Sequence, residues 1–556
     1  MIQLGISAFY HDSAACIVKD GKVLAAVEEE RFTEIKHDYS FPYNAIEWVL
    51  DYTGISIEQV DQVCWYERPD LKKDRVLKTF SKHWLKTFRL KKQFLKEFSK
   101  NNPDVILKEL GYKGEVIYIP HHLSHAAFGF FTSPYEQAAI LTIDGVGEWE
   151  TATISLGKDN DVFKMYSINF PNSLGLLYST ITAFLGFKPN EGEYKVMGLA
   201  PYGNPAKFYD KLRVACPDTE ELSIDTKYFP WEYSDKLMYN FKFSNLLELL
   251  PRLPEEEITQ DHKDLAASLQ KIYEEEFLKL VRRAKTLTNL DNLVLSGGCA
   301  YNGVANSLAY KFFKSVHIPF APSDAGSAIG ACLYNYEGPR ADNTSPYLGP
   351  EYSEDFIRTE ISKSGLKFFK FENEDLLLKR VAGLISNDNI VAWFQGRMEF
   401  GARALGNRSI LANPRNASMR NKLNKVIKKR EGFRPFAPSV LKESQNIWFI
   451  CREDVPYMNQ VVKIKGFNRK DPPNLLPSAT HVDFSARVHT VTQEQNRKYY
   501  NLLTELHRLT GFGVVLNTSF NLKDQTITMT PKQALDRFIN SDIDYLVLDN
   551  YLILKS

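Results

Sequence analysis

Short apolar runs alternate with tight polar turns over residues 1–31. The runs IQLGISA, AACIV and KVLAAVEEER are separated by His11-Asp12-Ser13 and by Asp20-Gly21. An Asp-Gly pair between two apolar runs is typical of a β-hairpin. A similar series of runs, AAILTIDG, TATISLG and VFKMYSI, recurs over 138–169. The pattern therefore predicts two copies of one strand-rich unit.

Over 258–284 the apolar positions recur with the period of a helix. Leu265, Leu269 and Leu280 fall on one stripe there, and a strand at Asn292–Leu295 follows. Such a stripe is typical of an amphipathic helix that covers a sheet. We therefore expect a long helix that leads directly into a core strand.

Gly, Pro, Asn and Ser concentrate over 340–352, which makes this stretch the best linker candidate. A second α/β pattern follows, with helices predicted at 375–386, 498–509 and 531–540, strands at 390–394 and 513–516, and a closing hairpin at Asp549-Asn550. We therefore expect two domains, over 1–345 and 350–556.

The stretch from Leu71 to Lys100 is rich in Lys and Arg. Its apolar residues Phe80, Trp84 and Phe88 stand at helical spacing. A cationic amphipathic helix can lie on a membrane or bind a nucleic acid. A domain helix with a solvated charged face is the commoner case, and we favour that interpretation.

The chain of 556 residues carries 69 Lys and Arg against 68 Asp and Glu, a net charge of +1. Its hydrophobic content of 44% excludes a disordered chain, and its neutrality argues against a protein coated in cations to hold DNA. Six cysteines without a CxxC pair predict reduced thiols. Without a basic leader or an apolar run of ~20 residues, we expect a soluble, cytoplasmic protein.

Two histidines, His121 and His125, stand four residues apart just after Pro120. Proline favours a helix start, so both imidazoles should project from one helical face and reach one metal ion. Asp144 and Asp324, each at a strand end or a strand-to-helix loop, are the best further donors. A His₂Asp₂ set suits iron, manganese or zinc better than a soft ion. Helix-capping histidines in a core are the alternative.

Glycines punctuate several strand ends, but no GxxxxGK[ST] sequence occurs, which excludes a P-loop nucleotide site. The glycine-rich stretches lie at 144–148, 191–203, 296–303 and 323–330. Glycine at a strand–helix junction lets backbone N–H groups approach a phosphate, although it also serves turns and close packing. Around a duplicated hairpin core, these stretches favour an actin- or Hsp70-like ATPase architecture.

The net charge conceals a cationic segment from Arg397 to Arg434. It holds eleven Lys and Arg but only two acidic residues, Glu399 and Glu431. Glycines beside arginines suit bidentate binding of a small phosphate or carboxylate. A groove for a nucleic-acid backbone is the alternative, but such grooves interleave aromatic residues with the cations, and here Gly, Ala, Asn and Pro do so.

These motifs together resemble the NodU/CmcH-type O-carbamoyltransferase family over essentially the whole chain. The matching stretches are HDSAA at 11–15, EEERF at 28–32, HHLSHAAF at 121–128, DGVGE at 144–148, EYKVMGLAPYG at 193–203, SGGCAYN at 296–302, GARALGNRSIL at 401–411, KKREGFRPFAP at 428–438, SARVHTV at 485–491 and LNTSFN at 516–521. Ala402 stands where the family usually has Pro, and His489 where Gln is frequent.

The resemblance implies an α/β protein with an ASKHA-type, actin/Hsp70-like duplicated domain (TsaD-like) followed by a YrdC-like α+β domain. In the family, the C-terminal domain forms carbamoyl-adenylate from carbamoyl phosphate and ATP and releases pyrophosphate. The N-terminal domain then transfers the carbamoyl group to a hydroxyl of a small acceptor and releases AMP.

The resemblance also assigns roles to residues. The metal ligands are His121, His125, Asp144 and Asp324, and the nucleotide-binding positions are Gly145, Gly147, Lys195, Gly297, Gly298 and Asn302. Carbamoyl phosphate and the adenylate are expected at Arg403, Lys428, Arg434, Arg487 and Asn517. Asp12 and Lys36 are expected near the acceptor, with His11 as general base and with Arg434 and Lys428 catalytic in the adenylation step.

The implied cofactor is a divalent metal, with Fe(II) favoured over Mn or Zn, and Mg²⁺ should accompany ATP. The expected partners are carbamoyl phosphate, ATP and a hydroxyl-bearing sugar or antibiotic, without nucleic acid or membrane, in a monomer or homodimer. A HypF-type enzyme, a tRNA threonylcarbamoyl enzyme and a non-enzymatic RNA-binding protein are the alternatives. The first of these would add CxxC zinc fingers, which this sequence lacks.

Overall fold

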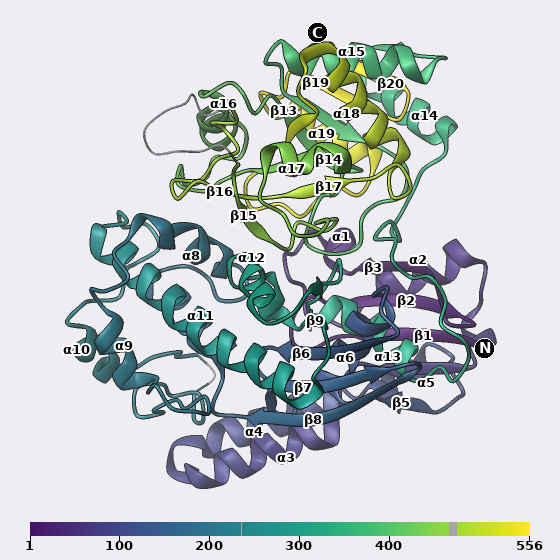
Figure 1. The fold of residues 1–556 in the computed structure, drawn as a ribbon. Helices are drawn as coiled ribbons and strands as arrows, with labels where there is room; N and C mark the ends of the chain where they lie inside the picture. The colour runs from purple at the N-terminus through teal and green to yellow at the C-terminus, as the bar shows by residue number, and fades with distance from the viewer. Residues whose placement is uncertain (235, 466–474, 556) are drawn as a thin grey trace. The chain divides into compact units, whose positions relative to one another are not determined.

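The computed structural model describes residues 1–234, 236–465 and 475–555 (Figure 1). These residues form two compact units. Unit 1 comprises 1–29 and 37–344, and unit 2 comprises 30–36 and 345–556. The predicted linker at 340–352 contains the point at which the chain passes from one unit to the other.

Unit 1 holds two five-stranded mixed sheets. The first has the order β3-β2-β1-β4-β5 and the second the order β8-β7-β6-β9-β10. The strands of the first sheet are β1 Ile2–Ser7, β2 Ala14–Lys19, β3 Lys22–Glu28, β4 Gln62–Trp65 and β5 Val116–Tyr118. Those of the second sheet are β6 Gln137–Ile143, β7 Glu150–Lys158, β8 Asp161–Asn169, β9 Asn292–Ser296 and β10 Ser315–His317.

The two sheets repeat one topology. In each, three successive strands pair antiparallel, and two later strands add in parallel on the other side of the first strand. This confirms the predicted duplication and the mixed α/β organisation. The loop after β1 and the loop after β6 are therefore equivalent, and they carry His11-Asp12 and Asp144-Gly145, respectively.

Two helices, α6 (His121–Phe131) and α13 (Asp324–Tyr334), pack closely against each other in unit 1. The contact depends on small residues of α13. A Cβ added to Gly330 would lie 1.9 Å from the carbonyl oxygen of Ser124, and one added to Gly326 would lie 2.4 Å from the ring of Phe128. Glycine at these positions therefore lets the two helices approach, which places their N-terminal residues near each other.

Gly330→Ala is expected to lower the free energy of unfolding by about 1–3 kcal/mol, because the added methyl forces the two helix backbones apart. Gly383→Ala is the matched control: Gly383 lies inside helix α15 (Glu374–Ser386), where a Cβ meets nothing within 4 Å. This control should stabilise its helix by about 0.5–1 kcal/mol. Urea unfolding of both variants measures the two effects, and equal stability of Gly330→Ala and the parent would contradict the close-packing argument.

Unit 2 is built on an eight-stranded mixed sheet of order β11-β20-β19-β12-β13-β18-β14-β17. Its strands are β11 Lys367–Lys370, β12 Val391–Phe394, β13 Arg408–Ala412, β14 Ala437–Leu441, β17 His489–Val491, β18 Val514–Ser519, β19 Tyr545–Leu548 and β20 Tyr551–Leu554. A separate ribbon pairs β15 (Val461–Lys463) with β16 (Ser485–Arg487).

Alternate residues of the unit 2 strands face two different cores. In β12, Ala392 and Phe394 join the core that includes helices α14 (Glu354–Ser364) and α19 (Pro531–Ile539), while Val391 and Trp393 join the other. Helices α15 and α18 (Arg497–Thr510) form that second core. The sheet is therefore covered by helices on both faces, which is an α/β arrangement.

Segment 30–36, with the one-turn helix α1 (Glu30–Thr33), belongs to unit 2 although it follows β3 of unit 1. The buried Arg31 donates from Nη2 to the Gly401 carbonyl at 3.0 Å, and Glu34 pairs with Arg537 at 2.8 Å. Phe32 packs against Met398, Ile527 and Met529. The prediction that 1–345 forms one domain is therefore corrected for this segment, since its contacts are with residues far along the chain that no local pattern reveals.

Candidate metal centre and phosphate site

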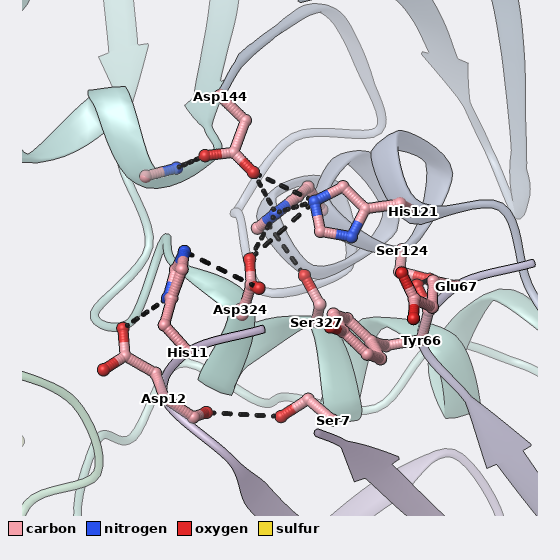
Figure 2. Close-up of polar contacts among 12 residues, drawn as sticks. Ser7, His11, Asp12, Tyr66, Glu67, His121, Ser124, Asp144, Asp324 and Ser327 are labelled. Carbon is pink, nitrogen blue, oxygen red and sulfur yellow. Dashed lines mark hydrogen bonds and ion pairs between the residues drawn. The ribbon is translucent and has the colours of Figure 1, made fainter. Parts of the chain in front are cut away.

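Four potential metal ligands meet in unit 1 (Figure 2). His121 and His125 lie one turn apart at the start of α6, directly after Pro120, as the spacing predicts. Asp144 follows β6, and Asp324 is the first residue of α13. The close packing of α6 on α13 brings the two helix starts to the end of β6. One ligand atom from each residue lies within 4.8 Å of all the others.

The imidazoles and carboxylates converge on one point. His121 Nε2 lies 2.9 Å from Asp144 Oδ2, and His125 Nε2 lies 3.3 Å from Asp324 Oδ1. The two Nε2 atoms are 3.2 Å apart. Two ring nitrogens that face each other at this distance, between two carboxylates, need a shared proton or a cation between them.

Burial strengthens the preference of this cluster for positive charge. All four side chains are buried, and neither carboxylate oxygen of Asp324 accepts a hydrogen bond within the described part of the chain. Although burial opposes protonation, Asp324 and Asp144 raise the pKa of His121 to about 9. Two buried carboxylates, one of them without a donor, and two imidazoles with converging nitrogens are the ligands that a divalent cation of borderline hardness prefers, so the residues fit the expected metal.

Neighbouring groups hold the ligands in place. Ser327, one turn into α13, contacts His125 Nδ1 at 2.9 Å, which leaves Nε2 available to a metal. Asp144 Oδ1 accepts from the Gly298 backbone N–H at 3.3 Å. Glu148 accepts from the His121 backbone N–H at 2.9 Å, which fixes the start of α6. Ser327 and Glu148 are positioning residues that the sequence patterns did not reveal.

His11 and Asp12 lie beside this cluster, in the loop after β1 (Figure 2). His11 Nδ1 contacts Asp12 Oδ2 at 3.1 Å, and Nε2 lies 3.7 Å from Asp324 Oδ2. Asp12 also contacts His37 Nδ1 at 2.5 Å through its other oxygen. Burial would raise the pKa of Asp12, but His37 and His11 hold it well below its usual range. Lys36, predicted beside Asp12 at the acceptor, belongs to unit 2.

The predicted nucleotide glycines surround Asp144. Gly297 has φ +88°, and a Cβ there would lie 2.2 Å from the Ile143 carbonyl oxygen. A Cβ on Gly147 would lie 2.8 Å from His121 Cδ2, so glycine here lets the loop approach the start of α6. A Cβ on Gly145 meets nothing closer than 3.6 Å, so a side chain would fit there. Close packing thus requires glycine at positions 147 and 297 but not at position 145.

Asn302 and Lys195, the other two predicted nucleotide ligands of unit 1, belong to different elements. The Asn302 side chain caps helix α12 (Gly303–Asn306) through the Ala305 N–H and exchanges two hydrogen bonds with Gln270. Lys195, on helix α8 (Glu193–Leu199), holds its ammonium 5.3 Å from the Phe187 ring centre. Asn302 therefore has a structural task in addition to any contact with a nucleotide.

In unit 2, one buried carboxylate shapes the glycine-rich loop before β13. Glu399 Oε1 accepts from the backbone N–H groups of Leu405, Asn407 and Arg408 at 2.7, 2.7 and 3.2 Å. Arg408 is buried and donates to the carbonyls of Gln395, Asn407, Pro350 and Gly396. Arg408 is thus a structural member of the cationic segment, and Glu399 holds the shape of the loop, a task that the sequence pattern did not reveal.

Asn517 joins this loop to strand β18, and Lys428 joins the segment before Arg434 to the end of the same strand. Lys428 Nζ donates to the Ser519 carbonyl and to both oxygens of Asn521. Asn517 Nδ2 donates to the Ala404 carbonyl and to Ser439 Oγ, each at 3.1 Å. Burial, followed by the nearby Arg430 and Arg434, holds the pKa of Lys428 well below its usual range. The Lys428 ammonium therefore lies in the same cationic field as Arg434.

The remaining three predicted phosphate ligands occupy different parts of unit 2. Arg403 precedes Ala404 in the glycine-rich loop, and Arg487 ends strand β16. Arg434 lies after Lys428 and contacts Glu431 at 3.4 Å. Asn517 links the loop of Arg403 to β18, and Lys428 links the segment of Arg434 to the same strand.

Both halves of the sequence match family models. The model described as carbamoyltransferase N-terminus covers residues 2–333, and that described as carbamoyltransferase C-terminus covers 382–555. An uncharacterised protein of Synechocystis sp. is 40% identical over 100% of this chain and 96% of its own. The nodulation protein NolNO of Sinorhizobium fredii is 35% identical over 99% of this chain and 80% of its own. A 3'-hydroxymethylcephem-O-carbamoyltransferase of Amycolatopsis lactamdurans is 32% identical over 60% of this chain and 59% of its own.

Proposed function

The chain belongs to the carbamoyltransferase family, and from this premise we propose that it is an ATP-dependent O-carbamoyltransferase with two coupled active sites. A buried His₂Asp₂ cluster in unit 1 and a cationic, glycine-rich loop in unit 2 carry the proposal, since each suits one of two half-reactions. One of the relatives is named for carbamoyl transfer to a hydroxymethyl group, and we infer a hydroxyl acceptor for this chain as well.

The first half-reaction belongs to unit 2, for which we infer a YrdC-like role. One water releases inorganic phosphate from carbamoyl phosphate, and the resulting carbamate oxygen attacks the α-phosphorus of ATP. Carbamoyl-adenylate forms and pyrophosphate leaves. The loop shaped by Glu399 presents Arg403, and Arg434 lies in the field of Lys428. These cations offset the charge that accumulates on the phosphates, an electrostatic contribution to catalysis.

The second half-reaction belongs to unit 1. A divalent metal held by His121, His125, Asp144 and Asp324, with Fe(II) favoured, would supply Lewis-acid polarisation. Asp12 accepts from His11 Nδ1, which leaves Nε2 as the nitrogen that takes the proton of the acceptor hydroxyl. The hydroxyl oxygen then bonds to the carbamoyl carbon, the bond to the adenylate oxygen breaks, and AMP leaves.

His11→Ala is expected to slow carbamoyl transfer by about 10²–10⁴-fold, because the acceptor hydroxyl loses its proton acceptor. Pyrophosphate release should stay near the parent rate, since that step belongs to unit 2. Asp12→Asn should give a smaller loss of transfer, because the imidazole remains but loses its orienting carboxylate. Parallel assays of carbamoylated product and pyrophosphate separate these effects, and equal losses in both assays would remove His11 from the transfer step.

The proposal as a whole is tested by product analysis. The protein should release pyrophosphate only when both ATP and carbamoyl phosphate are present, and an acceptor should then gain one carbamoyl group by mass. Hydroxyl-bearing sugars and antibiotics form the first screen, and we place acceptor selection in the region 205–255. ATP-independent carbamoyl transfer, or transfer only to tRNA or to a protein thiol, would contradict the proposal.

A further inference from the structure

Residues 69–100 form a basic hairpin of two helices on unit 1, α3 (Pro69–Lys82) and α4 (Trp84–Lys100), which break at His83 (Figure 1). Phe80 and Phe94 meet edge to face between the helices, and Thr87 is buried there. Glu232 pairs with Lys82 and His83, and the Trp149 indole donates to Asp74. The basic hairpin is thus a well-packed part of unit 1.

The basic hairpin has a strongly positive net charge, unlike the nearly neutral chain as a whole. The basic hairpin carries eleven Lys and Arg against three acidic residues, Asp70, Asp74 and Glu97, whereas the whole chain has a net charge of +1. On α4, the cations Arg89, Lys91, Lys92, Lys96 and Lys100 make no ion pair with any described residue. Within the described part of the chain, no acidic side chain therefore neutralises these five charges.

An apolar stripe faces outward from α4 among these cations. Trp84, Leu85 and Phe88 are 67%, 78% and 76% exposed. Leu95, two further turns along, is also exposed and falls on the same face as Trp84 and Phe88. The inner face of α4 is a different one, which bears Thr87, Leu90 and Phe94. The helix is therefore apolar on two sides, and the core of unit 1 uses only one of them.

The chemistry of the outer face favours a lipid surface over a nucleic acid. Nucleic-acid sites distribute aromatic rings for base stacking, whereas half of this stripe is the aliphatic Leu85 and Leu95, which cannot stack. Apolar side chains that include Trp, flanked by Lys and Arg, are typical of helices that lie in the headgroup region of a bilayer. Among the described residues, no helix is long and apolar enough to cross one.

We propose that the outer face of α4 binds the surface of an anionic lipid bilayer, with Trp84, Leu85 and Phe88 inserted among the acyl chains and the five unpaired cations on the headgroups. The protein would then act as a peripheral membrane enzyme, which revises the expectation from the sequence that no membrane is involved. The proposal is independent of the reaction assigned to either unit.

Flotation of the full-length protein with vesicles tests this. Vesicles with about 30 mol% phosphatidylserine should bind the protein, and pure phosphatidylcholine should bind it much more weakly, because each cation near an anionic surface contributes about fivefold in affinity. Trp84→Ala/Phe88→Ala should weaken binding at least tenfold. Lys92→Glu/Lys96→Glu should abolish the preference for phosphatidylserine, and rising salt should release the parent protein.

Phe241→Ala/Leu250→Ala is the matched control, because these residues are 71% and 79% exposed outside the basic hairpin. This control should bind vesicles like the parent. The circular dichroism spectrum and the thermal unfolding midpoint should be unchanged in all variants, which verifies that unit 1 is folded. Absence of vesicle binding at low salt, or equal binding by Trp84→Ala/Phe88→Ala, would overturn the proposal. Tight binding of a single-stranded RNA without vesicle binding would overturn it in favour of a nucleic-acid surface.

Discussion

His121→Ala is expected to lose the bound metal and at least 100-fold of carbamoyl transfer, while pyrophosphate release continues. His121 Nε2 lies 2.9 Å from Asp144 Oδ2 and 3.2 Å from His125 Nε2, so its removal takes one of four donors from a closed, buried set. The remaining His125 and two carboxylates would hold a cation far more weakly. Metal content by mass spectrometry and the two half-reaction assays measure the outcome.

His122→Ala is the matched control for this experiment. His122 is the next residue, equally buried, and neither of its ring nitrogens contacts a described partner. Burial lowers its pKa to about 3, so it is a neutral core residue. The control removes the same volume from the same helix and should retain the metal. Loss of metal from both variants would indicate unfolding of α6, and full metal content in His121→Ala would refute the ligand assignment.

Arg434→Ala is expected to reduce pyrophosphate release by about 10²–10³-fold, the usual effect of removing one charged group that stabilises a transition state. Arg434 lies close enough to Lys428 to lower the pKa of that lysine, and Lys428 is tied to the end of β18 beside Asn517. Arg434→Lys should recover only part of the rate, because an ammonium cannot bind a phosphate through two parallel hydrogen bonds. Initial rates with saturating ATP and carbamoyl phosphate measure both variants.

Arg415→Ala tests whether the effect is specific. Arg415 belongs to the same cationic segment but is exposed, and its guanidinium stacks 4.0 Å from the Phe512 ring centre. Its removal changes the net charge equally and should leave the rate within twofold of the parent. Comparable losses in Arg415→Ala and Arg434→Ala would show a diffuse charge effect, and full activity of Arg434→Ala would place the phosphate site elsewhere.

Local patterns predicted those parts of the fold that depend on short-range chemistry. Asp20-Gly21 marks the turn between β2 and β3, and the helical stripe from Leu265 to Leu280 lies within α11 (Gln260–Thr288). The stretch from Leu71 to Lys100 was predicted to form one helix. It forms two, since α3 ends at Lys82 and α4 starts at Trp84. The break at His83 packs one helix on the other, which periodicity within either helix does not encode.

The same distinction between local patterns and tertiary packing applies to the residues of the candidate site. The spacing of His121 and His125 indicates a shared helical face, and a strand end or a helix start indicates Asp144 and Asp324. The sequence did not predict the contacts of Glu399, Ser327 and Arg31, because each side chain bonds to a group that only the tertiary fold brings near. A buried carboxylate that accepts three N–H groups has the same sequence signature as a solvated surface glutamate.

The placement of segment 30–36 in unit 2 means that the chain passes between the units at three points, after residues 29, 36 and 344. A protease cut in the linker at 340–352 therefore leaves the units joined by covalent bonds at both ends of α1. If the gene were divided at the linker, Arg31 and Glu34 would be on one polypeptide and their partners Gly401 and Arg537 on the other. Segment 30–36 therefore cannot complete these contacts until the chain has been synthesised through Arg537.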